Sequence, residues 1–170
     1  MIVDEILGHV ATAVAARVAT SDTGSPSSFV ENPNAGGLDA AQDRHFEVGV
    51  VSLADVSHTG VDDQVAQMAG YMRLFVRVKY VNEARPLRSM HAIIAQDVRA
   101  LQDYVQKYVR EQGGGIGECF IDGEATLEEG DDPSIIYAFM PFRVEYVDTL
   151  VASATNGIGG FTYGFSAGFE

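Results

Sequence analysis

The sequence predicts an α+β fold, in which a small mixed or antiparallel sheet carries helices on one face in the order α-β-β-α-β-β. Two long segments with alternating apolar residues predict strands, and an amphipathic segment between them predicts a helix. The strands are expected at Tyr71 to Val81 and Tyr137 to Val147, and the helix at Pro86 to Glu111. Because side chains alternate across a strand, each strand should bury one face. The expected inward residues are Met72, Leu74, Val76, Val78 and Tyr80 in the first strand, and Ala138, Met140, Phe142, Val144 and Tyr146 in the second.

The segments before the first long strand have weaker patterns. Apolar residues recur every four positions from Ile2 to Thr20, which predicts a helix. A loop is expected at 22–42, which is rich in Gly, Ser, Pro and Asn, and a short strand at His45 to Val51. The segment Ser52 to Gly70 lacks clear periodicity and is expected to be an extended excursion between two strands. A connection of this length is often functional.

The amphipathic helix has a well-defined stripe and a well-defined end. Its apolar residues are spaced by three and four positions, and three glycines at 113–115 follow it, as expected of a helix terminus. The stripe consists of Leu87, Met90, Ile94, Val98, Leu101, Val105 and Tyr108. A strand region is expected at Ile116 to Glu128 with a bend at Asp122-Gly123, and Glu129 to Pro133 is expected to form a polar turn before the last strand.

The length of 170 residues predicts one domain, at 1–148, followed by an extension at 149–170. The extension contains five glycines and four aromatic residues but no lysine or arginine, so it cannot build its own core. We expect it to dock on a partner through Phe161, Tyr163, Phe165 and Phe169. The competing interpretation is that it completes the core of its own subunit as one more strand.

Composition argues against several classes of protein. A net charge of −13 opposes non-specific nucleic-acid binding, and no sequence-specific binding is expected either. No apolar run approaches the length of a membrane span, and the first residues carry acids where a secretion signal would carry bases. The single cysteine, Cys119, cannot form an internal disulfide and fits a reducing compartment.

Charge is segregated along the chain. Five of the eleven basic residues fall within sixteen positions, whereas Glu111 to Asp132 contains eight acids and no base. One interpretation is two solvated surfaces, or strands that neutralise each other within one subunit. The other is a contact between neighbouring copies. The residues proposed for that contact are Arg73, Arg77, Lys79, Arg85 and Arg88 on one side, and Glu118, Asp122, Glu124, Glu128 and Glu129 on the other.

Motifs for catalysis, cofactors or metals are absent from the sequence. The glycine run GGGIG follows a helix and lacks the spacing of a dinucleotide-binding loop. The four histidines are scattered singly, and the acidic segment after Asp122 does not match a calcium-binding loop. We therefore expect no enzyme activity, no cofactor and no metal.

Four segments, together with the order of elements, resemble the tail terminator (tail completion) proteins of long-tailed bacteriophages. They are RHFEVGVV, YMRLFVRVKYV, the helix RPLRSMHAIIAQDVRALQDYVQKYVR and the strand IIYAFMPFRVEYV, which lie within roughly residues 1–148. In that family a small sheet has helices on one side. Six copies form a ring that caps the tail tube and presents a face to the head-completion proteins.

The resemblance implies a structural protein of the virion neck that assembles in the host cytoplasm as a homohexamer. Its expected partners are the tail tube protein and the head-completion proteins. Two alternatives remain open. One is another virion joint, such as a head-completion or tail-tube protein, although a tube protein usually needs a long hairpin for stacking. The other is a small ligand-binding or enzymatic α+β domain.

Overall fold

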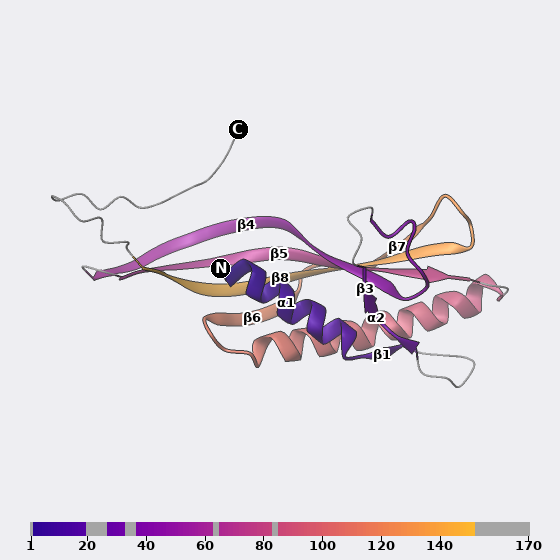
Figure 1. The fold of residues 1–170 in the computed structure, drawn as a ribbon, viewed down its shortest axis with the longest axis horizontal. Coiled ribbons are helices and arrows are strands. Elements are labelled where there is room, and N and C mark those ends of the chain that lie inside the picture. The colour runs from indigo at the N-terminus through magenta and orange to yellow at the C-terminus, as the bar shows by residue number, and fades with distance from the viewer. Residues whose placement is uncertain (1, 20–26, 33–36, 63–64, 83–84, 152–170) are drawn as a thin grey trace.

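The computed structural model shows an α+β fold of two layers, with a mixed sheet above two helices (Figure 1). It describes residues 2–19, 27–32, 37–62, 65–82 and 85–151. The helices are α1 (Ile2–Ala15) and α2 (Leu87–Arg110). The strands are β1 (Val18–Ala19), β2 (Ser27–Ser28), β3 (Val30–Glu31), β4 (His45–Asp62), β5 (Val65–Val81), β6 (Ile116–Ile121), β7 (Thr126–Glu129) and β8 (Ile135–Val151).

The strand order of the main sheet is β3-β4-β5-β8-β6, and β7 also pairs with β8. The β3–β4 pair is parallel and the others are antiparallel, so the sheet is mixed. The centre of the sheet is the β5–β8 pair, whose register runs without a break from Val65↔Val151 to Val81↔Ile135. Strands β1 and β2 form a separate two-stranded sheet.

The order is more elaborate than the predicted α-β-β-α-β-β, although the α+β class is confirmed. The segment predicted as a loop at 22–42 contributes the short strands β2 and β3. The strand region predicted at 116–128 is divided into β6 and β7. Gly123, at the predicted bend, has a φ of 122°, a conformation that residues with a Cβ rarely adopt.

The expected excursion at 52–70 is wrong, because these residues continue β4 and β5 as one long antiparallel hairpin. The pairing has register shifts between Val50 and Ser52, between Asp55 and Ser57, and between Thr59 and Val61. Each bulge inserts a residue and interrupts the alternation of side chains between the two faces. The sequence therefore lacks a period of two although its backbone is paired.

The predicted inward faces of the two long strands are confirmed. Every one of those ten residues is buried, and both helices pack against them in one core. Helix α2 contributes Met90, Ile94, Val98, Leu101, Val105 and Val109, and α1 contributes Ile2, Ile6, Val10 and Val14. Because α1 and α2 contact each other as well as the sheet, both described helices cover the same sheet face, and neither lies on the opposite face.

Two element ends differ from the sequence prediction. Helix α1 ends at Ala15 rather than near Thr20, and Val18 is 61% exposed because it pairs with Ser28 in β1 instead of extending the helical stripe. Strand β8 continues to Val151, three residues past the predicted domain boundary at 148, because its last residues pair with the start of β5. The end of α2 at Arg110 agrees with the glycines that follow it.

Candidate assembly surfaces

The sheet face opposite the helices carries a layer of arginine and aromatic side chains. Phe75 and Phe139 stack with ring centroids 5.1 Å apart. Room for this stack comes from Gly49 on β4, since a Cβ there would lie 2.5 Å from a ring carbon of Phe75. The guanidinium group of Arg143 lies 4.9 Å from the ring centre of Phe120, in the geometry of a cation–π contact.

Arginines on this face are paired with acids of the same subunit. Arg73 donates a hydrogen bond to Asp122, which partly offsets the like-charge contact that Arg73 makes with its register partner Arg143. Arg77 lies 3.6 Å from Glu47 and 3.7 Å from Glu128, and its guanidinium group stacks on a tyrosine ring. The structure therefore joins two of the predicted basic residues to two of the predicted acidic residues within one copy.

Lys79 lies inside the subunit. Its ammonium group donates hydrogen bonds to the carbonyl oxygens of Asp39 and Ala41, at 2.6 and 2.8 Å, and the residue is 3% exposed. The neighbouring Tyr137 donates its hydroxyl proton to Asp39 Oδ1 at 2.7 Å. Burial and this hydrogen bond raise the pKa of Tyr137 to about 12. The segment around Asp39 thus covers one end of the open sheet face.

The other predicted interface residues lie apart from this network. Arg85 belongs to the turn before α2, where its backbone N–H donates to Asn82 Oδ1 at 3.0 Å, and Arg88 is exposed in the first turn of α2. Glu118 lies 3.6 Å from Arg110, and both side chains are about half exposed. Glu124 and Glu129 are exposed on and beside β7. The predicted docking residues Phe161, Tyr163, Phe165 and Phe169 lie outside the described residues.

Beyond the helices, the outer parts of β4, β5 and β8 project as a three-stranded arm (Figure 1). A strand of 17 residues extends about 56 Å, whereas α1 with its 14 residues spans about 21 Å and α2 with its 24 residues about 36 Å. We call residues 55–62, 65–70 and 147–151 the arm. Its base carries the exposed apolar residues Val51 and Leu53, at 57% and 52% exposure. An apolar surface at the base of an arm suits contact with another protein.

A buried polar cluster, formed by Arg44, Tyr80 and Asp97, was not predicted from the sequence. Arg44 is 6% exposed, its Nε lies 3.7 Å from Asp97 Oδ2, and its guanidinium group lies 4.5 Å from the Tyr80 ring centre. Burial, and then the negative charge of Asp97, raise the pKa of Tyr80 well above its usual value. The sequence holds one signal of this cluster, because Asp97 lies three residues after Ile94 and four before Leu101, within the apolar stripe of α2.

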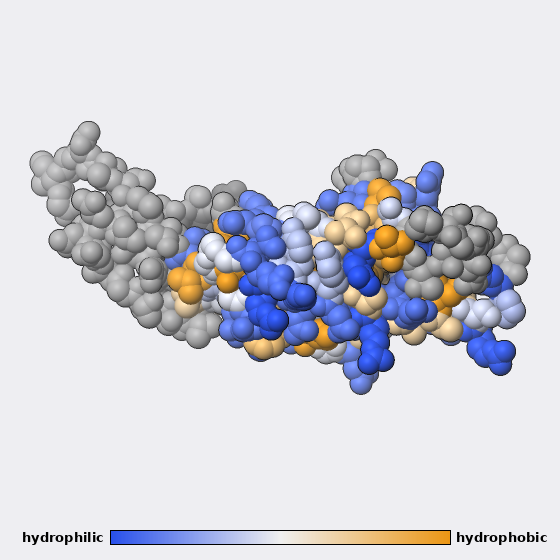
Figure 2. All heavy atoms as spheres, turned by 90° about the horizontal axis from the view of Figure 1, so that it is seen from below, coloured by the Kyte–Doolittle hydropathy of each residue, from blue (hydrophilic) through white to orange (hydrophobic). Residues whose placement is uncertain are grey.

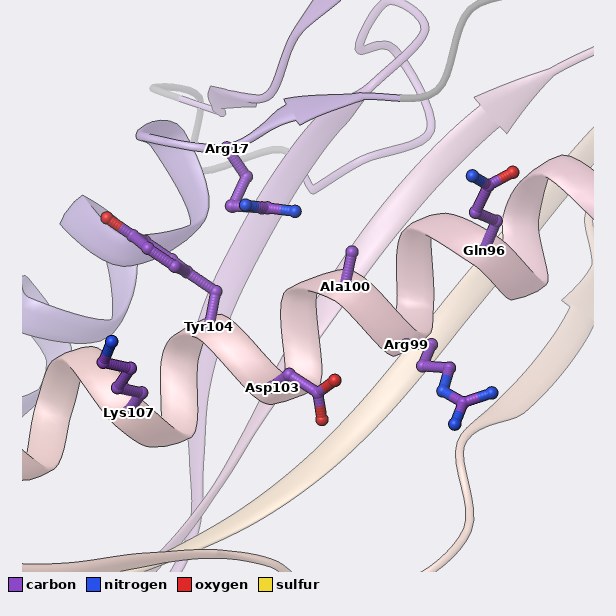
Figure 3. Close-up of a pocket in the computed structure, with 7 residues that line it drawn as sticks. All are labelled: Arg17, Gln96, Arg99, Ala100, Asp103, Tyr104 and Lys107. Atoms are coloured by element: carbon purple, nitrogen blue, oxygen red, sulfur yellow. The ribbon is translucent and has the colours of Figure 1, made fainter.

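The outer side of α2 is polar (Figure 2), and it holds a groove of about 460 Å³ next to the end of α1. The groove is lined by Arg17, Gln96, Arg99, Ala100, Asp103, Tyr104 and Lys107. Figure 3 shows Arg17 reaching over α2 from the segment after α1, beside the Tyr104 ring, with a guanidinium-to-ring distance of 5.3 Å. Lys107 points to the same side as Tyr104, whereas Arg99 lies on the side away from Arg17.

The described residues contain no cluster of His, Cys, Asp and Glu side chains that could hold a metal ion. Cys119 is fully buried, and burial raises the pKa of its thiol to about 12, which makes it a poor nucleophile at neutral pH. Neither helix in the described part of the chain is long and apolar enough to cross a membrane.

No protein-family model matches the chain, and no curated protein matches it either.

Proposed function

We propose that this chain is a structural protein of the phage virion that forms a ring capping the tail tube and joins it to the head-completion proteins. The observation that carries this proposal is the arm, in which three strands extend past the helices of the same subunit. Three strands need a hydrophobic face or a packed helix for independent stability, and no described helix lies over the arm, so a surface of another protein would stabilise it. Assembly supplies such a surface.

The segments that resemble tail terminators lie in the centre of the fold. They form the start of β4, the last two thirds of β5, helix α2 and the first three quarters of β8, which make the two-layer core together with α1. The proposed partners are copies of the same chain, the tail tube protein and the head-completion proteins.

A tail-tube protein is the second candidate function, and the long β4–β5 hairpin favours it. The segment Ser52 to Gly70 lacks clear alternation, so the sequence predicts no such hairpin, which argues against a tube protein. Because β4 and β5 pair from Phe46↔Val78 to Asp62↔Val65, that argument no longer holds. The two functions differ in how far assembly proceeds, since a terminator closes one ring whereas a tube protein stacks ring upon ring.

Mass and shape of the purified full-length protein test the proposal. We expect native mass spectrometry to give six copies, and negative-stain electron microscopy to show single rings that bind one end of purified tail tubes. Long tubes formed by the protein alone would assign the tube function instead. A protein that stays monomeric at high concentration and does not bind tube ends would overturn both assignments.

A further inference from the structure

We propose that the groove on the outer side of α2 binds the acidic β7 end of a second copy of this chain. The basic groove is defined by Arg17, Arg99 and Lys107, and the acidic end by Glu124, Glu129, Asp131 and Asp132. The inference rests on the proposed ring, and it identifies which two surfaces of each copy meet.

The groove carries more positive than negative charge, because Arg17, Arg99 and Lys107 line it together with a single carboxylate, that of Asp103. Arg44, Arg73, Arg77, Arg110 and Arg143 all have carboxylates of the same copy within 4 Å, and Lys79 is buried. By contrast, Arg99 and Lys107 are exposed, and neither makes an ion pair with a described residue. Arg17 is held in place over the Tyr104 ring. These three cations are therefore available to a partner.

The acidic end carries negative charge that forms no ion pair with the described residues. No lysine or arginine occurs between Arg110 and Arg143, so the residues around β7 have no basic neighbour in sequence. All four acids are exposed, and none forms an ion pair with the described part of the chain. A hydrogen bond from the backbone N–H of Ser134 lowers the pKa of Asp132 and so keeps this carboxylate ionised.

Geometry favours a second copy as the occupant. Figure 1 shows β7 at one end of the sheet, where it pairs with β8, and α2 below the sheet, so the two charged surfaces of one copy face different directions. Two different surfaces that recognise each other produce a head-to-tail contact, and such contacts close into rings when the rotation permits. Each copy has a net charge of −13, so two copies repel each other over most of their surface. They can attract each other where an acidic surface of one copy meets a concentration of positive charge on the other.

Charge reversal on each surface tests the contact. The groove variant carries Arg99→Glu and Lys107→Glu, and the acidic-end variant carries Glu129→Lys and Asp131→Lys. Each pair of changes replaces attractions with repulsions, so we expect the concentration at half-assembly to rise about tenfold or more. Wild-type assembly should also weaken as NaCl is raised from about 50 to about 500 mM.

An equimolar mixture of the two variants provides the decisive measurement. In the mixture, a reversed groove meets a reversed acidic end, and a native groove meets a native acidic end. A ring with an even number of copies can alternate the variants, so sedimentation velocity should show assembly restored to within about threefold of wild type. The matched control is His91→Glu, which adds a carboxylate to the exposed side of α2 outside the groove and should leave assembly unchanged.

The possible results distinguish failure of the proposed contact from failure of the proposed ring. Normal rings in both variants would overturn the contact and leave the ring in place. Loss of assembly in His91→Glu but not in the groove variant would move the contact to the start of α2. Normal assembly with lost binding to a short DNA duplex would assign the cations to nucleic acid. If the wild-type protein does not oligomerise, both the ring and this contact fail.

Discussion

Asp97 is a buried acid whose substitution should lower the free energy of unfolding. Its carboxylate faces Arg44 and Tyr80 and is 2% exposed, so Asp97→Ala leaves a buried guanidinium group with less compensation. Arg44 keeps the 2.7 Å contact with Asp43. We therefore expect a loss of about 3 kcal/mol in the free energy of unfolding, at the low end for a broken buried pair. Urea denaturation monitored by circular dichroism measures it.

Asp103→Ala is the matched control, because it removes an exposed carboxylate from the same helix. A change within about 0.5 kcal/mol is expected there. Equal effects of the two variants would contradict the role assigned to the buried cluster.

The thiol of Cys119 should make stability depend on pH in the alkaline range. Its pKa is raised from 9.0 to about 12 in the folded protein by burial. Between these values the unfolded chain loses the proton while the folded chain keeps it, so the unfolded state binds fewer protons. The contribution of this group to stability therefore falls above about pH 9, by about 1.4 kcal/mol per pH unit.

Comparison with Cys119→Ala isolates this thiol, because the buried tyrosines titrate in both proteins. Between pH 8 and 10.5, wild type should lose about 2 kcal/mol more than the variant in the free energy of unfolding. Parallel stability curves for the two proteins over this range would show that the thiol ionises normally.

The sequence predicted the burial of single residues best in strands where apolar and polar residues alternate strictly. The ten inward residues of β5 and β8 were predicted correctly, because strict alternation leaves one choice of face. The partners of the charged residues were not predictable in the same way. Arg73 and Asp122 are 49 positions apart, and their contact depends on the register of β6 against β8. The sequence shows where charged residues occur along the chain, but it does not show which of them form ion pairs in the folded structure.

At the scale of the element, α2 should depend on a single apolar stripe. Leu101 is 1% exposed and lies in the helix–sheet core, so Leu101→Asp places an unpaired charge there. The loss of stability should exceed about 4 kcal/mol, a large part of the total for a domain. Thermal melting should show an unfolded or strongly destabilised protein.

Ala95→Asp tests the same helix on its exposed side. Because this variant adds the same charge without burying it, it should melt close to wild type. An unchanged melting curve for Leu101→Asp would mean that the assigned face of α2 is wrong.

The arm should be needed for assembly but not for folding. Replacing residues 56–69 with Asn-Gly would join Asp55 to Gly70, which are register partners, through a two-residue hairpin turn. The melting temperature should stay within about 4 °C, since the two-layer core is untouched. Rings should be lost, as measured by sedimentation velocity. A truncated protein that still forms rings would contradict the function assigned to the arm.

The arm also shows where prediction of elements from sequence failed. Period-two alternation identified β5 and β8, which pair without a register shift. Strand β4 has three register shifts, and the sequence shows no regular pattern where they occur. Edge strands often carry such bulges because they prevent unwanted pairing. The bulges that prevent unwanted pairing of an edge strand thus also remove the alternating pattern by which its sequence could be recognised.

For the whole molecule, the segment 152–170 lies outside the described residues and its docking stays a prediction. We expect that deleting it will leave the melting temperature unchanged and abolish ring formation or binding to tube ends. The reason is that its aromatic residues offer apolar area for a partner, whereas its glycines make self-ordering costly in backbone entropy. A monomer that melts substantially earlier after the deletion would show that the segment belongs to its own subunit's core.

The position of the last strand fixes where that segment is attached. Strand β8 ends at Val151 beside Val65, so the described chain ends at the outer tip of the arm rather than near the helices. Nineteen residues extend at most about 65 Å, which is close to the length of β8 itself. If these residues dock as proposed, their attachment at the arm would hold the aromatic side chains at an effective concentration of about a millimolar next to a neighbouring copy. Weak aromatic contacts would then be enough to stabilise the proposed ring.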